Sequence, residues 1–89
     1  MRTILISGAS RGIGLNIAHR ELKDGNRISI GIRDLESIKG SIIDPEKWPK
    51  EKLLINKYDA LDKFTAEKWI KNTISQYGGF DSLINCSGV

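Results

Sequence analysis

The chain has 89 residues, of which 39% are hydrophobic and 28% are charged, and its formal net charge is +3. A chain of this length forms one compact domain or part of one, because it buries only about 60–65% of its unfolded surface. The charge balance is ordinary for a solvated surface, and no cluster of Lys and Arg is interleaved with aromatic residues. We therefore expect no nucleic-acid partner.

The chain shows no sign of export or of a membrane span. The apolar runs at residues 4–6 and 28–32 are far too short to cross a bilayer. Ser7 and Gly8 interrupt the first run, so no signal peptide is expected. The single cysteine, Cys86, excludes an internal disulfide framework. These features predict a cytoplasmic protein.

The first half of the chain reads as strand, helix, strand. Residues 3–7 and 27–33 are rich in isoleucine and predict strands. Between them, apolar side chains at positions 13, 17, 18 and 22 recur at helical spacing. The sequence Asp24-Gly25-Asn26 supplies the turn that ends this helix.

The second half begins irregularly and then repeats the alternation. Gly40, Pro45 and Pro49 leave room only for a short helix at residues 35–39 and a loop that carries Trp48. We interpret Trp48 as a hydrophobic plug over the sheet edge, with an oligomer or domain contact as the alternative. A strand at residues 52–57, an amphipathic helix over positions 66–77 with Asp62 as its N-cap, and a strand at residues 82–86 follow.

Alternating strands and helices predict an α/β fold built from βαβ units around a parallel sheet. The apolar positions within the predicted strands are nearly continuous, as in residues 4–6 and 53–55. Continuous apolar runs are typical of strands that are covered on both faces.

Gly8, Gly12 and Gly14 are spaced Gly-x-x-x-Gly-x-Gly between the first strand and the first helix. One glycine permits the sharp exit from the strand, one lets the backbone approach a pyrophosphate, and one lets the helix pack close to the sheet. The N-terminus of the helix faces the phosphate charge. Ser10 adds a hydroxyl donor and Arg11 a cation, so this turn predicts a dinucleotide site.

The end of the second strand lies beside the adenosine ribose in such folds and decides which dinucleotide is bound. Arg33 and Arg11 can close on a 2′-phosphate from two sides, which favours NADP. Asp34 argues for NAD if it contacts the ribose, although it can instead cap the short helix that follows.

These residues resemble the N-terminal half of a short-chain dehydrogenase/reductase. Residues 7–14 resemble the family signature Thr-Gly-x-x-x-Gly-x-Gly, with Ser7 in place of threonine. Residues 85–88 resemble its Asn-Asn-Ala-Gly motif, with Cys86 and Ser87 as departures, and Asp59-Ala60 resembles the pair that contacts adenine. The run Arg33 to Ile38 resembles the Arg-x-x-x-x-Leu of members that prefer NADP.

The resemblance implies a Rossmann-type parallel sheet with flanking helices, four strands in the order 3-2-1-4, over residues 1–89. In that order the glycine turn and residues 85–88 border the same crevice, where ligands bind in open α/β sheets. It implies NADP, with NAD as the less favoured cofactor, and a homo-oligomeric intact form. The expected cofactor-binding residues are Gly8, Ser10, Arg11, Gly12, Ile13, Gly14, Arg33, Asp59, Ala60, Asn85, Ser87 and Gly88.

The resemblance also implies a reductase whose catalytic half is not in this sequence. The family uses a serine and a Tyr-x-x-x-Lys pair, whereas Tyr58 and Tyr77 are each followed four residues later by an aspartate. No catalytic residue and no metal ligand is expected, since His19 reads as a surface residue and Cys86 as a packing residue. The alternative is a non-catalytic nucleotide-binding or interaction module that associates through an open sheet edge.

Overall fold

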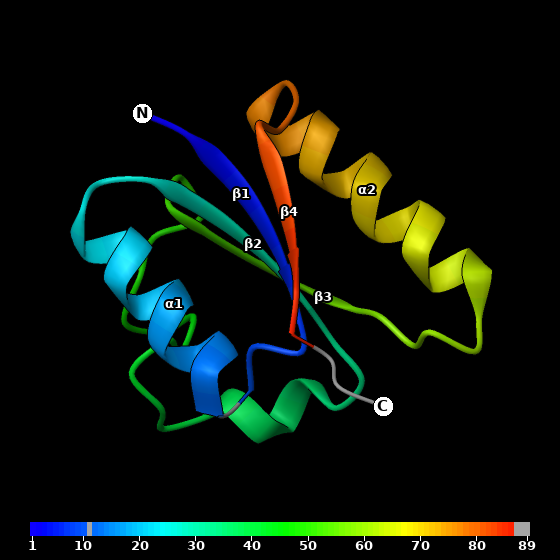
Figure 1. The fold of residues 1–89 in the computed structure, drawn as a ribbon, viewed down its shortest axis with the longest axis horizontal. Helices are drawn as coiled ribbons and strands as arrows, with labels where there is room; N and C mark the ends of the chain where they lie inside the picture. Colours follow the sequence, from blue (N-terminus) through cyan, green and yellow to red (C-terminus); the bar gives the residue numbers. More distant parts are fainter. Residues whose placement is uncertain (11, 87–89) are drawn as a thin grey trace.

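A computed structural model of the chain describes residues 1–10 and 12–86. Four parallel strands form one sheet in the order β3-β2-β1-β4. The helix α1 covers one face of this sheet and α2 covers the other (Figure 1). The predicted α/β fold and its strand order are confirmed. The elements are β1 (Thr3–Ser7), α1 (Gly12–Lys23), β2 (Arg27–Ile32), the 3-10 helix η1 (Leu35–Ile38), β3 (Leu53–Lys57), α2 (Lys63–Tyr77) and β4 (Ser82–Asn85).

The main core lies between the sheet and α1. Side chains alternate between the two faces of a strand, so every second residue of β1 and β2 points towards α1. Ile4 and Ile6 of β1 and Ile28 and Ile30 of β2 are buried there, together with Leu22 of α1. The ends of α2 are also as expected, since the Asp62 carboxylate accepts a hydrogen bond from the Phe64 N–H and the chain leaves the helix at Gly78.

The other face of the sheet is packed with polar and aromatic side chains. The indole N–H of Trp69 donates to the Ser29 hydroxyl at 2.9 Å, and the Ser29 and Thr73 hydroxyls lie 2.7 Å apart. All three side chains are buried, so these hydrogen bonds keep the polar groups of the interface satisfied. The helix α2 is therefore held over β2 by a specific hydrogen-bond network as well as by apolar contact.

Two expectations about apolar residues are wrong. Ile13 was expected on the buried face of the first helix, but 76% of its surface is exposed because it precedes Gly14, where α1 first meets the sheet. The strand at residues 82–86 was expected to be covered on both faces, but Leu83 is 56% exposed. Within the described residues, α2 packs on β2 through Trp69 and on β3 through Asn72, and it leaves the Leu83 side chain of β4 uncovered.

The segment between η1 and β3 closes the α1 side of the sheet. Trp48 is half-buried against the core, donates its indole N–H to the Ile42 carbonyl and contacts the His19 ring edge-on. This agrees with the interpretation of Trp48 as a plug and shows that His19 is half-buried, not a solvated surface residue. At the start of β3, the Tyr77 hydroxyl donates to the Lys50 carbonyl at 2.8 Å.

Removal of the Tyr77 hydroxyl should make the free energy of unfolding less dependent on pH in the alkaline range. Burial raises the pKa of Tyr77 from 10.0 to about 12, while the Arg27 guanidinium over its ring opposes this shift. The stabilising neutral phenol is fully present below pH 10, and its contribution is lost as the pH rises from about 10 towards 12. We expect Tyr77→Phe to cost about 1 kcal/mol at pH 8 and to lose less stability than wild type between pH 9 and 11. Urea unfolding across this range tests it, and parallel curves for both proteins would contradict it.

Candidate functional site

Strand register brings the predicted site residues to one edge of the sheet. Ser7, the last residue of β1, pairs with Gly31 of β2 on one side and with Asn85 of β4 on the other. The glycine turn therefore leaves the sheet between the end of β2 and the end of β4. This is the carboxyl edge, where open α/β sheets bind their ligands.

The turn after β1 requires glycine at two positions. Gly8 and Gly12 have φ values of 72° and 64°, in the left-handed region that side chains disfavour. The Gly8 N–H donates to the Gly31 carbonyl at 2.9 Å, which ties the turn to β2. The predicted sharp exit from the strand is present, and Ser10 lies half-exposed within it.

Gly14 allows α1 to come close to the sheet. A Cβ atom built on Gly14 would lie 3.0 Å from the Ala9 Cα, the Gly8 carbonyl oxygen and the Cys86 Cβ. The first turn of α1 is thus in contact with the residue that follows β4. This contact joins the two sequence motifs, the glycine turn and the segment from Asn85, at one place.

The N-terminus of α1 suits an anion better than that of α2. The first turn of α1 contains no acidic residue, and Arg20 and Lys23 lie in its last turn, where they complement the helix dipole. The first four N–H groups of a helix have no partner within the helix and point along its axis. In α2, by contrast, the Asp62 carboxylate occupies this position as an N-cap.

Asn85 joins the edge strand β4 to the central strand β1. The Ser7 hydroxyl donates to the Asn85 Oδ1 at 2.7 Å, and the Cys86 N–H donates to the Ser7 carbonyl at 2.9 Å. These two hydrogen bonds link β4 to its neighbour β1 at the carboxyl edge. Cys86 packs against the hydrophobic core and is half-buried, in line with its interpretation as a packing residue.

Arg33 and Asp34 follow β2, and the two side chains have different roles. The Asp34 carboxylate accepts the Glu36 N–H at 3.0 Å, and its carbonyl accepts the Ser37 hydroxyl at 2.6 Å. Asp34 is therefore the N-cap of η1. Arg33 is exposed at the carboxyl edge, one residue beyond β2.

Asp59 is held in the turn between β3 and α2. Its Oδ1 accepts the Leu61 N–H at 3.0 Å, and its own N–H donates to the Thr65 hydroxyl at 2.9 Å. Within residues 1–10 and 12–86 its second carboxylate oxygen makes no hydrogen bond. Ala60, beside it, is exposed. Arg11, Ser87 and Gly88, also predicted for the site, lie outside the described residues.

Sequence reasoning missed the role of Gly31. A Cβ atom at this position would lie 2.8 Å from the Trp69 ring and 2.8 Å from the Tyr58 Cβ, so the glycine lets α2 settle onto β2. The Tyr58 and Trp69 rings are 5.1 Å apart and cover it. A glycine inside a strand of isoleucines was the available signal, because such a glycine often marks a close approach.

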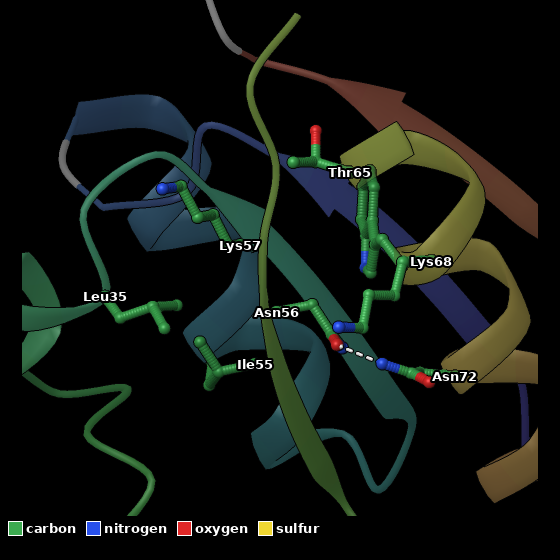
Figure 2. Close-up of a pocket in the computed structure, with 8 residues that line it drawn as sticks. Leu35, Ile55, Asn56, Lys57, Thr65, Lys68 and Asn72 are labelled. Atoms are coloured by element: carbon green, nitrogen blue, oxygen red, sulfur yellow. Dashed lines mark hydrogen bonds between the residues drawn. The ribbon is translucent and has the colours of Figure 1, made fainter. Parts of the chain in front are cut away.

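A cavity of about 290 Å³ lies at the outer edge of β3, away from the predicted site (Figure 2). It is bordered by Leu35 of η1, by Asn56 and Lys57 of β3 and by Asn72 of α2. The Asn72 amide donates to the Asn56 Oδ1 at 2.8 Å, while the buried Asn56 Nδ2 has no partner among the described residues. Of the predicted cofactor-binding residues that the structure describes, none lines this cavity.

Residues 1–10 and 12–86 contain no group of three or more His, Cys, Asp or Glu side chains placed to hold a metal ion. In the same residues, both helices are too short or too polar to cross a membrane.

Comparison with known proteins agrees with this geometry. A family profile described as short chain dehydrogenase matches residues 2–89. An agropine synthesis reductase of Rhizobium rhizogenes is 35% identical over 85 residues, which are 96% of this chain and 19% of the relative. The chain thus spans about a fifth of this relative's length.

Solved structures share the same arrangement. A short chain dehydrogenase from Bacillus anthracis is 28% identical with a TM-score of 0.85. The match includes 98% of this chain and 35% of the Bacillus anthracis chain. An alcohol dehydrogenase from the archaeon Thermococcus sibiricus, solved with 5-hydroxy-NADP, is 26% identical with a TM-score of 0.78, over 93% of this chain and 35% of that one. Together, the profile match over nearly every residue, the strand order and the glycine turn at the carboxyl edge place this chain in the short-chain dehydrogenase family.

Proposed function

We propose that this chain is the NADP-binding part of a short-chain reductase. The observation that carries the proposal is the contact of Gly14 with Cys86 at the carboxyl edge. It places a helix N-terminus without acidic residues beside the ends of β1 and β4, where a pyrophosphate would be held by the amides of the glycine turn. Ser10 and Ile13 flank this position, and Ile13 is exposed there.

A preference for NADP over NAD is supported by the different roles of Arg33 and Asp34. The Asp34 carboxylate is engaged in capping η1, so Arg33 is the charged group at the end of β2 that would meet the adenosine ribose. An arginine there offers a bidentate contact to a 2′-phosphate, with Arg11 as a second cation. The Thermococcus sibiricus relative was solved with an NADP derivative, which supports the same choice.

The other predicted residues would bind the two ends of the dinucleotide. Asp59 offers a carboxylate oxygen to the adenine amino group, and Ala60 packs beside the ring. Asn85, through its bond to Ser7, holds the end of β4 in place for Ser87 and Gly88 beside the nicotinamide-side ribose. These roles are inferred from the family resemblance and, for Asp59, Ala60 and Asn85, from their positions after β3 and at the end of β4.

When bound, NADP(H) supplies or accepts the hydride for reduction of a carbonyl or oxidation of an alcohol. The residues of this chain bind and orient the dinucleotide, and the serine and Tyr-x-x-x-Lys pair of the family are absent from its sequence. We therefore expect the chain alone to bind NADPH without catalysing reduction. The cytoplasmic location and the homo-oligomeric intact form stay predictions.

Replacement of Arg33 by alanine tests the cofactor assignment. Loss of a charged hydrogen bond to the 2′-phosphate should weaken NADPH binding by about 1.5–3 kcal/mol, or roughly 10- to 150-fold in Kd. NADH binding should change little, because NADH has no 2′-phosphate. Calorimetric titration of both dinucleotides into the wild type and Arg33→Ala measures the difference.

Arg20→Ala is the matched control, since Arg20 is also exposed but lies in the last turn of α1. It should bind both dinucleotides as the wild type does. Equal losses for NADPH and NADH in Arg33→Ala would overturn the NADP assignment. Failure of the folded wild type to bind either dinucleotide would overturn the proposed function.

A further inference from the structure

The cavity shown in Figure 2 lies at the outer edge of the sheet. Among the described strands β3 pairs with β2 alone, so its other side is open. The cavity lies between η1 and α2 at this open side, and its volume of about 290 Å³ is well above the roughly 30 Å³ that one water molecule occupies. It has room for a small organic molecule.

One buried polar atom in this cavity has no hydrogen-bond partner among the described residues. The Asn56 Oδ1 accepts the Asn72 amide N–H at 2.8 Å, and this bond orients the Asn56 side chain. The Asn56 Nδ2 is buried and unpaired within the same part of the chain. Buried donors are nearly always hydrogen-bonded in folded proteins. The Asn56 Nδ2 therefore indicates an acceptor that residues 1–10 and 12–86 do not supply.

The other polar groups of the cavity also favour an acceptor. Lys57 and Lys68 line it and are exposed, and no acidic side chain is among the described residues that line it. The Thr65 hydroxyl is already engaged, since it donates to the Asp62 carbonyl at 2.6 Å. The cavity thus offers an amide donor and two cations, and this combination favours an anionic ligand.

Apolar side chains form the rest of the lining. Leu35 of η1 is 46% exposed, Ile55 of β3 is half-buried, and Trp69 of α2 is buried. Sites for small molecules are typically lined by apolar side chains, with a few polar groups that set the orientation of the ligand. An inorganic anion would leave the apolar surface of Leu35 in water. A ligand with both an anionic group and an apolar body matches this lining better.

We propose that this cavity is a second ligand site, separate from the dinucleotide site, and that it binds a small organic carboxylate with an apolar body. The carboxylate accepts a hydrogen bond from the Asn56 Nδ2 and pairs with the Lys68 ammonium group. The apolar body lies across the edge of β3 against Leu35. Of the described residues predicted to bind the dinucleotide, none lines the cavity, so the inference does not depend on the proposed function.

Lys68 controls access to the buried amide. Its side chain extends towards Asn56 in Figure 2, on the α2 side of β3. An exposed lysine has a long flexible stem, so it can turn aside to admit a carboxylate and then close on it through a charge-assisted hydrogen bond. Side chains alternate along a strand, so Lys57 lies on the opposite face of β3 and adds to the positive potential at the edge.

A titration with benzoate tests the proposal. The isotope-labelled 89-residue chain is titrated with sodium benzoate at constant ionic strength, and its amide signals are followed by NMR. We expect a saturable shift of the Asn56 side-chain amide and of the backbone amides at residues 55–57 and 65–72. Benzamide has the same ring without the charge, and inorganic phosphate has a charge without the ring, so each should bind at least about tenfold more weakly.

Asn56→Asp is the decisive variant. Aspartate has nearly the same shape and keeps the oxygen that accepts from Asn72, but it replaces the Nδ2 donor with a second acceptor. Loss of a charge-assisted hydrogen bond should raise the Kd for benzoate by at least about tenfold. Lys68→Gln should raise it by about two- to fivefold. Lys71→Gln is the matched control, because Lys71 is exposed on α2 but does not line the cavity, and it should bind benzoate as the wild type does.

Circular dichroism confirms that each variant folds, and Lys68→Gln carries the test if Asn56→Asp does not fold. Absence of a saturable shift in the wild type, or equal binding by all three variants, overturns the proposal. Equal binding of benzamide would show that the charge is not recognised. Equal binding of phosphate would show that the lysines attract any anion, and either result contradicts a carboxylate site.

NADPH separates this cavity from the dinucleotide site. Benzoate should bind with the same Kd in the presence and in the absence of saturating NADPH. Competition would mean that benzoate enters the dinucleotide site, and the proposal would be wrong. If NADPH binds and benzoate does not, the proposed function stands and only this inference fails. The reverse result keeps the carboxylate site and removes the dinucleotide assignment.

Discussion

Replacing Trp69 with alanine should lower the free energy of unfolding by about 3–5 kcal/mol. The Trp69 ring is buried against Gly31 and Tyr58, and its N–H donates to Ser29. Its removal leaves a cavity between α2 and β2 and takes a partner from the buried Ser29 hydroxyl. Since domains of this size are stable by about 5–15 kcal/mol, much of the molecule's stability depends on this residue.

Trp69→Phe separates packing from hydrogen bonding. Phenylalanine keeps most of the apolar ring but cannot donate to Ser29, while the Ser29–Thr73 hydrogen bond is preserved. We expect a loss of only about 1–2 kcal/mol. Urea unfolding followed by circular dichroism gives both values. If Trp69→Ala costs no more than Trp69→Phe, the ring does not hold α2 on the sheet.

Gly14→Ala should affect both the fold and dinucleotide binding. The added Cβ meets the Ala9 Cα and the Gly8 carbonyl oxygen at 3.0 Å, and backbone atoms cannot move aside as a flexible side chain does. Overpacking of this kind costs about 1–3 kcal/mol. Because α1 must shift away from the end of β4, the Kd for NADPH should rise by about a hundredfold or more, roughly 2.7 kcal/mol.

Asn16→Ala is the control for the effect of alanine in the same helix. Asn16 is exposed on α1, and alanine is the better helix former, so its stability should be unchanged or slightly higher. Calorimetric titration with NADPH and thermal unfolding are measured on both variants. Unchanged NADPH binding by folded Gly14→Ala would show that the close approach of α1 is not needed for the site.

The strand and helix boundaries show how far local patterns reach. The isoleucine runs, the helical spacing and the caps at Asp62 and Asp34 depend on neighbouring residues, and each expected element is present within three residues of its predicted ends. The three strand ends that differ, at Arg33, Lys52 and Cys86, are positions where ladder pairing stops. Pairing depends on the neighbouring strand, so the sequence of one strand does not show where its pairing stops.

Burial was predicted less well for the same reason. Ile13 fits the helical pattern but is exposed, and Leu83 fits a buried strand but is not covered. Whether an apolar residue is buried depends on the element that lies over it, and that element is set by the path of the chain. The polar network of Ser29, Trp69 and Thr73 also joins residues 40 or more positions apart, which no local pattern encodes.

The sequence by itself determined the order of the elements, the glycine turn, the family and the candidate residues, because these depend on residue type and short-range spacing. The tertiary structure alone decided that Asp34 caps η1 while Arg33 is exposed, that Gly14 meets Cys86, and that Gly31 accommodates Trp69. It also left Leu83 of β4 exposed. The contacts of Gly14 and Gly31 join segments that are distant in the sequence. The role of Asp34 depends on which hydrogen-bond partner its carboxylate meets. Both are decided only when the chain packs in three dimensions.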